Sequence, residues 1–340
     1  MAEAEAGHLY IVTHTDLDGV GSAAAAVAVF GRRSGEYTVL YAEPYNVHEK
    51  IAEIAEYMEK GDILVIADLG PNRDSFPHAV KAIEGLAGKG VRVYWFDHHV
   101  WDPAEAEAVE KAGARLILDR TTCATGVVAR YAPSILGVEK PPFFEELEKA
   151  VCAADLWRWD HHLAPKLYRV AEARGEGVRP EDWRNRLVAK FSEGTLWDEE
   201  MESRLEDYVN RELANYNSIL KTVVVVDGAC RVAAAYKERG PPANSFVAAS
   251  LLARHDADIA VIVRENGGMS LRSRRVNVRE VAVRLGGGGH PVAAGAKIKI
   301  PITVRLAAKL SKKMLSRHAA RVVLKAAEEA GVCKGPPVEG

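Results

Sequence analysis

Short apolar runs alternate with amphipathic stretches over the first half of the chain. The runs that predict strands lie at 8–13, 37–41, 62–67, 91–96 and 115–118. The spacing of apolar positions predicts helices over 21–31, 48–60, 77–88 and 103–112. Strands and helices that alternate in this way are typical of a parallel sheet with helices on both faces. In such sheets, ligands bind beyond the carboxyl ends of the strands.

The pattern changes after about residue 165, in keeping with a chain of 340 residues that is long enough for two domains. Helices are predicted over 143–160 and 198–219, and the second of these is highly charged and is interpreted as a connector. Further strands are predicted at 222–227, 230–235, 259–264 and 268–272, and further helices over 244–255, 277–285 and 303–330.

The predicted fold class is α/β, with an N-terminal parallel-sheet domain, a smaller C-terminal α/β domain and the active site in the cleft between them. The expected boundaries are 1–195 for the first domain, 196–220 for a helical linker and 221–335 for the second domain. We find no internal repeat that would indicate a solenoid.

Composition excludes several classes of protein. Hydrophobic residues make up 48% and charged residues 27%, as in soluble globular proteins. No window approaches the roughly 18 uncharged apolar residues of a membrane span, and residues 1–7 carry two Glu where a signal peptide would be basic. We therefore expect a cytoplasmic protein with no membrane partner. Gln is absent, which fits an archaeal or thermophilic source.

The four Cys lie far apart and have no metal-like spacing. A disulfide framework or a zinc ribbon is therefore predicted to be improbable, and any metal should be bound by carboxylates and imidazoles. The net charge of −2 conceals an asymmetry, because residues 221–340 hold 21 Lys and Arg against 9 Asp and Glu. An acidic part that binds cations and a basic part that binds phosphate would explain this asymmetry. An uneven distribution of surface charge without a functional role would explain it equally.

Asp and His residues follow three of the predicted strands. The positions are His14, Asp16 and Asp18 after the first, Asp68 after the third, and Asp97, His98 and His99 after the fourth, with Asp155 in the later helix. A single Asp at a strand end is more often a turn or helix cap. Several carboxylates at one sheet edge would instead repel each other unless a cation neutralised them. Oxygen and imidazole donors suit Mn²⁺ or Mg²⁺, and two ions with a shared carboxylate are a known device for hydrolysing phosphate esters.

These segments resemble the DHH phosphoesterase superfamily, which includes RecJ exonucleases, nanoRNase/pAp phosphatases and family II pyrophosphatases. The similarity rests on HTDLDGVGS at 14–22, AD at 67–68, DHH at 97–99 and AD at 154–155. The segment GGGGHPVAAG at 286–295 is similar to the signature of the DHH-associated substrate-binding domain. The resemblance covers both halves of the chain.

The resemblance implies a centre of two Mn²⁺ ions, for which Mg²⁺ is an alternative. One ion would be held by His14, Asp16 and Asp68, and the other by Asp18, Asp68, His98 and Asp155. Asp97 would orient a His, and His99 would face the substrate. Pyrophosphatase- and nanoRNase-type members place three residues between the His and the first Asp of this motif. In this chain only Thr15 lies between His14 and Asp16. This spacing is closer to the RecJ pattern, in which an Asp stands at the position of His14.

The Gly-rich segment could be a flexible turn or a phosphate cradle. Backbone N–H groups of Gly286, Gly287, Gly288 and Gly289 can approach an anion without a side chain in the way. Arg272 and Ser273 match the substrate-contacting position of the family, and Arg is suited to phosphate. His290 is a candidate for a phosphate or sugar contact. A second Asp-His-His run, Asp160–His162, follows a helix rather than a buried strand, so we do not assign it to the metal motif.

The expected activity is an exonuclease or oligoribonuclease acting on short single-stranded RNA or DNA, or a phosphatase of nucleotides such as pAp. Alternatives are a RecJ-like exonuclease on longer strands, a pyrophosphatase or polyphosphatase, and a non-catalytic scaffold. Long nucleic-acid strands are disfavoured as substrates because aromatic residues make up 7% of the chain and no aromatic-rich basic stripe is evident. A homodimer is an expected assembly.

Overall fold

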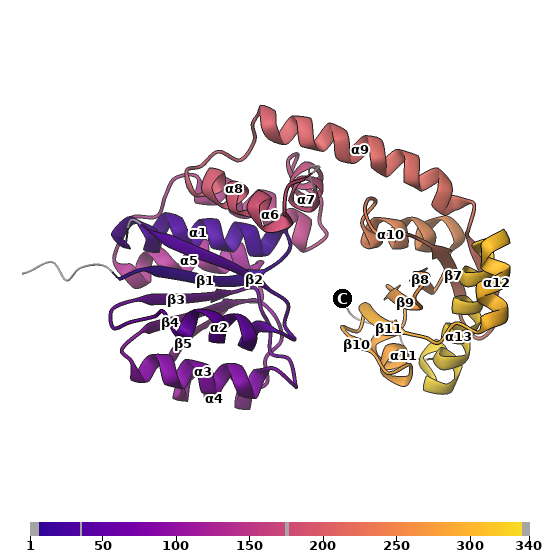
Figure 1. Cartoon of the computed structure of the whole chain (residues 1–340), viewed down its shortest axis with the longest axis horizontal. Coiled ribbons are helices and arrows are strands. Elements are labelled where there is room, and N and C mark those ends of the chain that lie inside the picture. The colour runs from indigo at the N-terminus through magenta and orange to yellow at the C-terminus, as the bar shows by residue number, and fades with distance from the viewer. Residues whose placement is uncertain (1–6, 35, 174–176, 335–340) are drawn as a thin grey trace, which may run out of the picture. The chain divides into compact units, whose positions relative to one another are not determined.

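The computed structural model describes residues 7–34, 36–173 and 177–334. The chain forms two compact units, one ending at Glu206 and the other beginning at Asp207, and each is described by itself (Figure 1). Residues 1–6, 35, 174–176 and 335, which the predicted domains include, lie outside the described residues. Within the described ranges, no helix is both long enough and apolar enough to cross a bilayer.

The first unit contains a five-stranded sheet in which all neighbouring strands run parallel, in the order β2-β1-β3-β4-β5. The strands are β1 (Leu9–His14), β2 (Tyr37–Ala42), β3 (Ile63–Ala67), β4 (Arg92–Asp97) and β5 (Ala114–Leu118). Strand order reverses at β1, because β2 and β3 lie on either side of it. The carboxyl ends of β1 and β3 are therefore the topological switch point at which such sheets bind ligands.

Helices cover both faces of this sheet (Figure 1). One face carries α1 (Leu17–Ser34), α5 (Ala124–Leu136), α6 (Phe144–Asp155), α7 (Ala164–Glu172) and α8 (Pro180–Ser192), and the other carries α2 (Val47–Ala55), α3 (Phe76–Gly88) and α4 (Pro103–Lys111). Alternate residues of β1 enter the two cores, since Leu9 and Ile11 pack on one side and Val12 on the other. The nearly continuous apolar runs of β1 and β3 follow from burial on both faces.

The second unit begins within α9 (Glu199–Leu220) and is built on a mixed sheet of order β10-β11-β9-β8-β7-β6. Its strands are β6 (Val224–Asp227), β7 (Arg231–Tyr236), β8 (Ile259–Val263), β9 (Gly268–Arg272), β10 (Gly288–Gly289) and β11 (Ala293–Lys297). Its helices are α10 (Asn244–His255), α11 (Val278–Arg284), α12 (Ile302–Leu310) and α13 (Lys313–Ala330), followed by the 3₁₀ turn Val332–Lys334. The predicted fold class, a parallel-sheet α/β domain followed by a smaller α/β domain, is confirmed.

Some predicted elements differ from those observed. The helix predicted over 143–160 ends at Asp155, and the tail predicted as one helix is two, α12 and α13, because the backbone at Ser311 is extended (φ −152°, ψ 118°). Helices α5, α7 and α8 were not predicted at all. Gly288 and Gly289, predicted as part of a turn or cradle, form the short strand β10.

The prediction that disulfides are improbable is wrong. Cys123 is bonded to Cys152, and Cys230 is bonded to Cys333. The partners are 29 and 103 residues apart in sequence, so the short Cys spacings that reveal small disulfide scaffolds were absent. The fold, rather than local spacing, brings each pair together.

Candidate metal centre

The first group of side chains surrounds the turn from β1 into α1. His14 ends β1, and its Nδ1 lies 2.9 Å from Asp16 Oδ2 and 3.6 Å from Asp68 Oδ2. The Gly19 N–H donates to Asp16 Oδ1 at 3.1 Å, and a Cβ at Gly19 would lie 2.1 Å from the His14 carbonyl oxygen. Only Gly permits this tight approach, so the turn depends on Gly19 to keep Asp16 beside the end of the strand.

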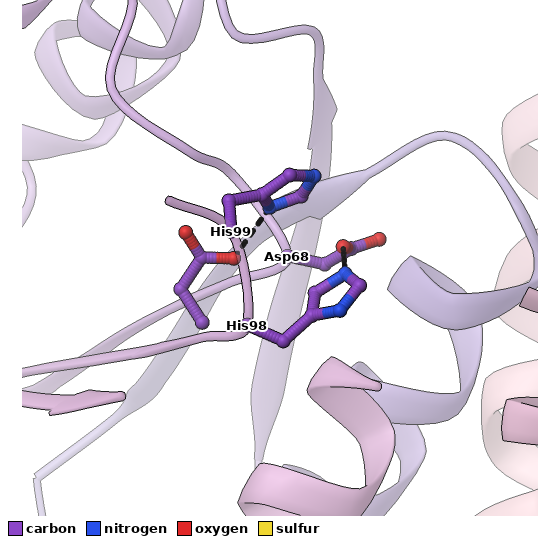
Figure 2. A group of neighbouring side chains, drawn as sticks. Asp68, His98 and His99 are labelled. Carbon is purple, nitrogen blue, oxygen red and sulfur yellow. Dashed lines mark hydrogen bonds and ion pairs between the residues drawn. The ribbon is translucent and has the colours of Figure 1, made fainter. Parts of the chain in front are cut away.

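A second group gathers around His98, which follows β4. Its Nε2 lies 3.5 Å from Asp68 Oδ1, 3.8 Å from Asp18 Oδ2 and 3.8 Å from Asp155 Oδ2. Figure 2 shows the His98 ring turned toward Asp68. Asp18 lies in the first turn of α1, and each of its carboxylate oxygens accepts a 2.8 Å hydrogen bond from the start of α5, from the N–H of Ala124 or Thr125.

Asp68 lies between the two groups. One of its oxygens faces His14 and the other faces His98. The residue directly follows β3, is 3% exposed and has a left-handed backbone (φ 58°), which Asp tolerates better than most residues. Its Oδ2 is buried without a hydrogen-bond partner among the described residues. An unsatisfied buried carboxylate oxygen is costly, and a cation would satisfy it.

When no cation is present, the carboxylates of this site repel each other electrostatically. Burial, and then the neighbouring carboxylates, hold the pKa values of Asp68 and Asp155 well above their usual range, and burial also raises the pKa of Asp18. Burial lowers the pKa of His14, but its contacts with Asp16, Asp68 and Glu43 together raise it by more, to well above its ordinary value. The donor set is oxygen and imidazole, which fits Mn²⁺ or Mg²⁺ and would relieve the repulsion.

Asp97 and His99 form a pair beside this site. Asp97 ends β4 and is fully buried, with its Oδ1 2.7 Å from His99 Nδ1, and its Oδ2 accepts a 2.6 Å hydrogen bond from the indole N–H of Trp101. Burial lowers the pKa of His99, but the contacts with Asp97 outweigh this and raise it. The imidazolium form of His99 is thereby favoured, as a proton donor requires.

Glu43 is a residue of this site that the sequence analysis missed. It directly follows β2, and its carboxylate oxygens lie 3.2 Å from His14 Nε2 and 2.8 Å from the Thr15 hydroxyl. With Nε2 toward Glu43, the His14 Nδ1 faces Asp16 and Asp68. A carboxylate on the far side of a ligand imidazole fixes its tautomer and orientation. The signal was present in the sequence, because Glu43 is a carboxylate at a strand end like the others.

Replacing Glu43 with Gln is expected to weaken divalent-cation binding. The change keeps the shape but removes the charge that orients His14, and such outer contacts are typically worth about 10–100-fold in metal affinity. Isothermal titration with Mn²⁺ measures the effect, and Glu49→Gln, an exposed carboxylate in the first turn of α2, is the matched control. Equal dissociation constants for the two variants would show that Glu43 has no such role.

The Gly-rich segment lies in the second unit, against β11. Gly288 pairs with Gly295 and Gly289 with Ala294, and a Cβ at Gly287 would lie 2.0 Å from the Gly295 carbonyl oxygen. Glycine at 287 is therefore required by the neighbouring strand. Cβ atoms at Gly286 and Gly288 would meet nothing within 4 Å, so these two positions leave open space.

The other predicted substrate contacts also lie in the second unit. Arg272 ends β9 and its guanidinium donates to the Leu271 carbonyl oxygen at 3.0 Å. Ser273 is 3% exposed, and its hydroxyl donates to the Asp258 carbonyl oxygen and accepts from two backbone N–H groups. His290 is exposed in a turn closed by backbone hydrogen bonds with Ala293. Ser273 is thus fully engaged in holding its own loop.

The second Asp-His-His run lies away from the metal centre within the first unit. His161 and His162 gather with Glu146, and His161 Nε2 lies 2.9 Å from the Glu146 carboxylate. Glu146 is in the first turn of α6 and Asp155 is the last residue of that helix. At 1.5 Å per residue the two are about 13 Å apart along the axis.

Comparisons with known proteins agree with this architecture. Residues 8–154 match the model of the DHH family, N-terminal domain, and residues 230–317 match the model of the DHHA1 domain. No curated protein matches the chain.

Several solved structures share the fold. A pGpG-specific phosphodiesterase, PggH from Vibrio cholerae, is 17% identical with a TM-score of 0.55, and the match covers 90% of this chain and 98% of that one. RecJ from Thermus thermophilus in complex with Mn²⁺ is 16% identical with a TM-score of 0.59, covering 98% of this chain but 53% of that one. An exopolyphosphatase-related protein from Bacteroides fragilis is 13% identical with a TM-score of 0.56, covering 97% and 94%. These likenesses show the fold, and the two matching domain models show that the chain belongs to the DHH family and carries a DHHA1 domain after its N-terminal domain.

Proposed function

We propose that this protein is a phosphoesterase that hydrolyses phosphodiester or phosphomonoester bonds of short single-stranded oligonucleotides or of nucleotides, with two Mn²⁺ ions as cofactor and Mg²⁺ as an alternative. The observation that carries the proposal is the buried Asp68 oxygen that has no hydrogen-bond partner among the described residues and lies between two groups of carboxylates and imidazoles. Structures of the same fold include a pGpG-specific phosphodiesterase and RecJ with Mn²⁺.

Two sets of residues would hold the cations. One donor atom from each of His14, Asp16 and Asp68 lies within 4.8 Å of the others, which suits one ion. The second ion would be held by Asp18, Asp68, His98 and Asp155. Asp68 would bridge, because its two oxygens face the two sets.

The bound cations would supply Lewis acidity and would lower the pKa of a water molecule that attacks phosphorus. His99 would donate a proton or a hydrogen bond to a phosphoryl or leaving oxygen, and Asp97 would keep its ring oriented and protonated. The start of α5 would fix the Asp18 carboxylate through the N–H groups of Ala124 and Thr125.

In this proposal, residues 1–195 are the catalytic domain, 196–220 the linker and 221–335 the substrate-binding domain. The candidate substrate contacts are Arg272, His290 and the Gly286–Gly289 backbone. Of these contacts, Gly287 lines a hollow in the second unit together with Gly295, Arg264 and Lys297, which supports its role. Both basic residues would favour a phosphate there. A cytoplasmic location and a homodimer stay predictions.

A length series of labelled RNA and DNA oligonucleotides, with pAp and pyrophosphate as further substrates, tests the function. Each is incubated with Mn²⁺, with Mg²⁺ and with a chelator. We expect cation-dependent release of mononucleotides or phosphate, fastest from the shortest oligonucleotides. Turnover of pyrophosphate alone would favour the pyrophosphatase alternative, turnover of long strands alone a RecJ-like exonuclease, and no turnover of any substrate a non-catalytic scaffold.

The stabilisation by Mn²⁺ is expected to grow with pH. Folding raises the pKa values of Asp68, Asp155 and His14, so the metal-free folded protein holds protons that the unfolded chain releases. The stability that these protons provide is present at low pH and is lost as pH rises through the raised pKa values. A cation must displace the same protons, so it binds better at high pH.

Thermal unfolding with and without Mn²⁺, measured between about pH 5.5 and about pH 8.5, checks this expectation. The cation-induced rise in melting temperature should increase steadily over the range. A rise that stays constant or shrinks with pH would show that these groups do not compete with the cation for protons.

A further inference from the structure

The disulfide between Cys123 and Cys152 lies in the wall of the candidate metal centre. Cys123 is the residue directly before α5, and Cys152 lies in α6, three residues before Asp155. Both cysteines are at most 1% exposed. The bond therefore joins the start of α5, whose N–H groups bind Asp18, to the helix that carries Asp155.

The sulfur of Cys123 is close to two proposed ligands of one cation. One carboxylate oxygen of Asp18, one of Asp155 and the Cys123 Sγ all lie within 4.8 Å of each other. A sulfur and an oxygen bound to the same Zn²⁺ ion, with bonds of about 2.3 Å and about 2.1 Å, can be at most about 4.4 Å apart. Only a small movement would bring the three atoms around one ion.

Cys152 faces other groups. Its Sγ lies 3.4 Å from the Thr122 hydroxyl, and that hydroxyl donates to Glu148 at 3.3 Å. Glu148 is outside the set of proposed cation ligands. The two sulfurs of one bond thus have different surroundings, and only Cys123 is grouped with carboxylates of the metal centre.

We propose that this disulfide withholds a sulfur ligand from the metal centre, and that its reduction changes which cations the centre prefers. While the bond is intact, the donors are oxygen and imidazole, which suit Mn²⁺ or Mg²⁺. Once it is open, Cys123 adds a soft donor beside Asp18 and Asp155, which favours Zn²⁺ or Cd²⁺. The inference rests on the proposed function, because it takes the same carboxylates as cation ligands.

The redox step balances with a dithiol as reductant. The sulfur–sulfur bond breaks, the dithiol supplies two electrons and two protons, and two thiols form while the dithiol becomes a disulfide. When a thiophilic cation then binds, the Cys123 thiol releases its proton to water, since the thiolate is the metal ligand.

Two single variants distinguish the effect of Cys123 as a metal ligand from the effect of losing the disulfide. Cys152→Ser leaves the Cys123 thiol at the metal centre, whereas Cys123→Ser leaves the Cys152 thiol beside Thr122, and both lose the same disulfide. Each full-length variant is titrated with Cd²⁺, and the ultraviolet charge-transfer absorption of a thiolate bound to Cd²⁺ is recorded. Cys230 and Cys333 stay bonded in both variants, so they add no thiol.

We expect the absorption in Cys152→Ser and not in Cys123→Ser, together with at least about tenfold tighter Zn²⁺ binding by the former. Equal spectra and equal Zn²⁺ affinities would overturn the inference. If Cys152→Ser does not fold, the natural chain is reduced with a dithiol, freed of it and loaded with Zn²⁺. X-ray absorption must then show more sulfur around zinc than in reduced Cys123→Ser, in which the dithiol opens the Cys230–Cys333 bond equally, and equal zinc–sulfur shells would overturn the inference.

Mn²⁺ binding by the natural chain distinguishes the two proposals. Suppose that the natural chain binds Mn²⁺ and hydrolyses a phosphate ester, but that its Cys152→Ser variant shows no sulfur-to-cadmium absorption. The proposed function is then supported, and this inference is overturned. If the natural chain binds no Mn²⁺ and hydrolyses none of the substrates, both the proposed function and this inference are overturned.

Discussion

Asp68→Asn is expected to abolish cation-dependent hydrolysis while the protein stays folded. Among the described residues, Asp68 is the one carboxylate that faces both groups of candidate ligands, so the variant would lose the proposed bridge between the cations. Metal ions supply several kcal/mol of transition-state stabilisation, and a loss of about 4 kcal/mol corresponds to roughly a 10³-fold lower kcat/KM. Steady-state hydrolysis of the best oligonucleotide substrate measures the effect.

Asn is the right replacement because Asp68 has a left-handed backbone, which Asn also tolerates. The melting temperature of the metal-free variant should be no lower than that of the natural chain, because Asn cannot carry the negative charge that burial and the neighbouring carboxylates disfavour at this position. The matched control is Asp74→Asn, the same change at an exposed residue on the loop after the same strand. Activity of Asp68→Asn equal to that of this control would refute the two-cation assignment.

The sequence was sufficient to predict the sheet edge that carries the site. The apolar runs that became β1, β3 and β4 are each followed directly by Asp or His, and the parallel arrangement brings those ends together. Burial on both faces makes such strands easy to recognise. Glu43 could have been found by the same rule, since it follows β2.

Helix α5 could not be predicted in the same way, because it is apolar nearly all round. Most of its residues between Ala124 and Pro133 are buried and the helix contains Gly126 and Pro133, so few polar positions mark an exposed face. The two N–H groups that bind Asp18 were missed for this reason. Nearly every residue has a backbone N–H group, so the sequence does not show which of these groups bind a carboxylate.

The Gly-rich segment shows a different limit of sequence reasoning. Four consecutive Gly indicate that something approaches the backbone closely, but not what approaches. At Gly287 the approaching group is the neighbouring strand, through the Gly295 carbonyl, whereas Gly286 and Gly288 face open space. The same pattern therefore serves strand packing at Gly287 and Gly289 and leaves room for a ligand at Gly286 and Gly288.

Removal of the Cys230–Cys333 disulfide is expected to destabilise the second unit strongly. Cys230 directly precedes β7 and Cys333 follows α13, which packs against that strand, so the bond closes a loop that holds most of the unit. For partners 103 residues apart, the loss of chain entropy in the unfolded state sets a ceiling of about 4.7 kcal/mol, and measured values are typically about 2–4 kcal/mol. We expect Cys230→Ser with Cys333→Ser to lower the free energy of unfolding by an amount in that range.

Thermal and denaturant unfolding of the full chain, in oxidising and in reducing buffer, measure this loss. The double variant should unfold earlier than the natural chain in oxidising buffer, and a dithiol should remove most of the difference because it opens the same bond in the natural chain. Thiol titration of the oxidised, unfolded natural chain should find no free cysteine, since all four are bonded. Four titratable thiols, or equal stability of the two proteins in oxidising buffer, would show that this bond does not form. The original inference from cysteine spacing would then be correct.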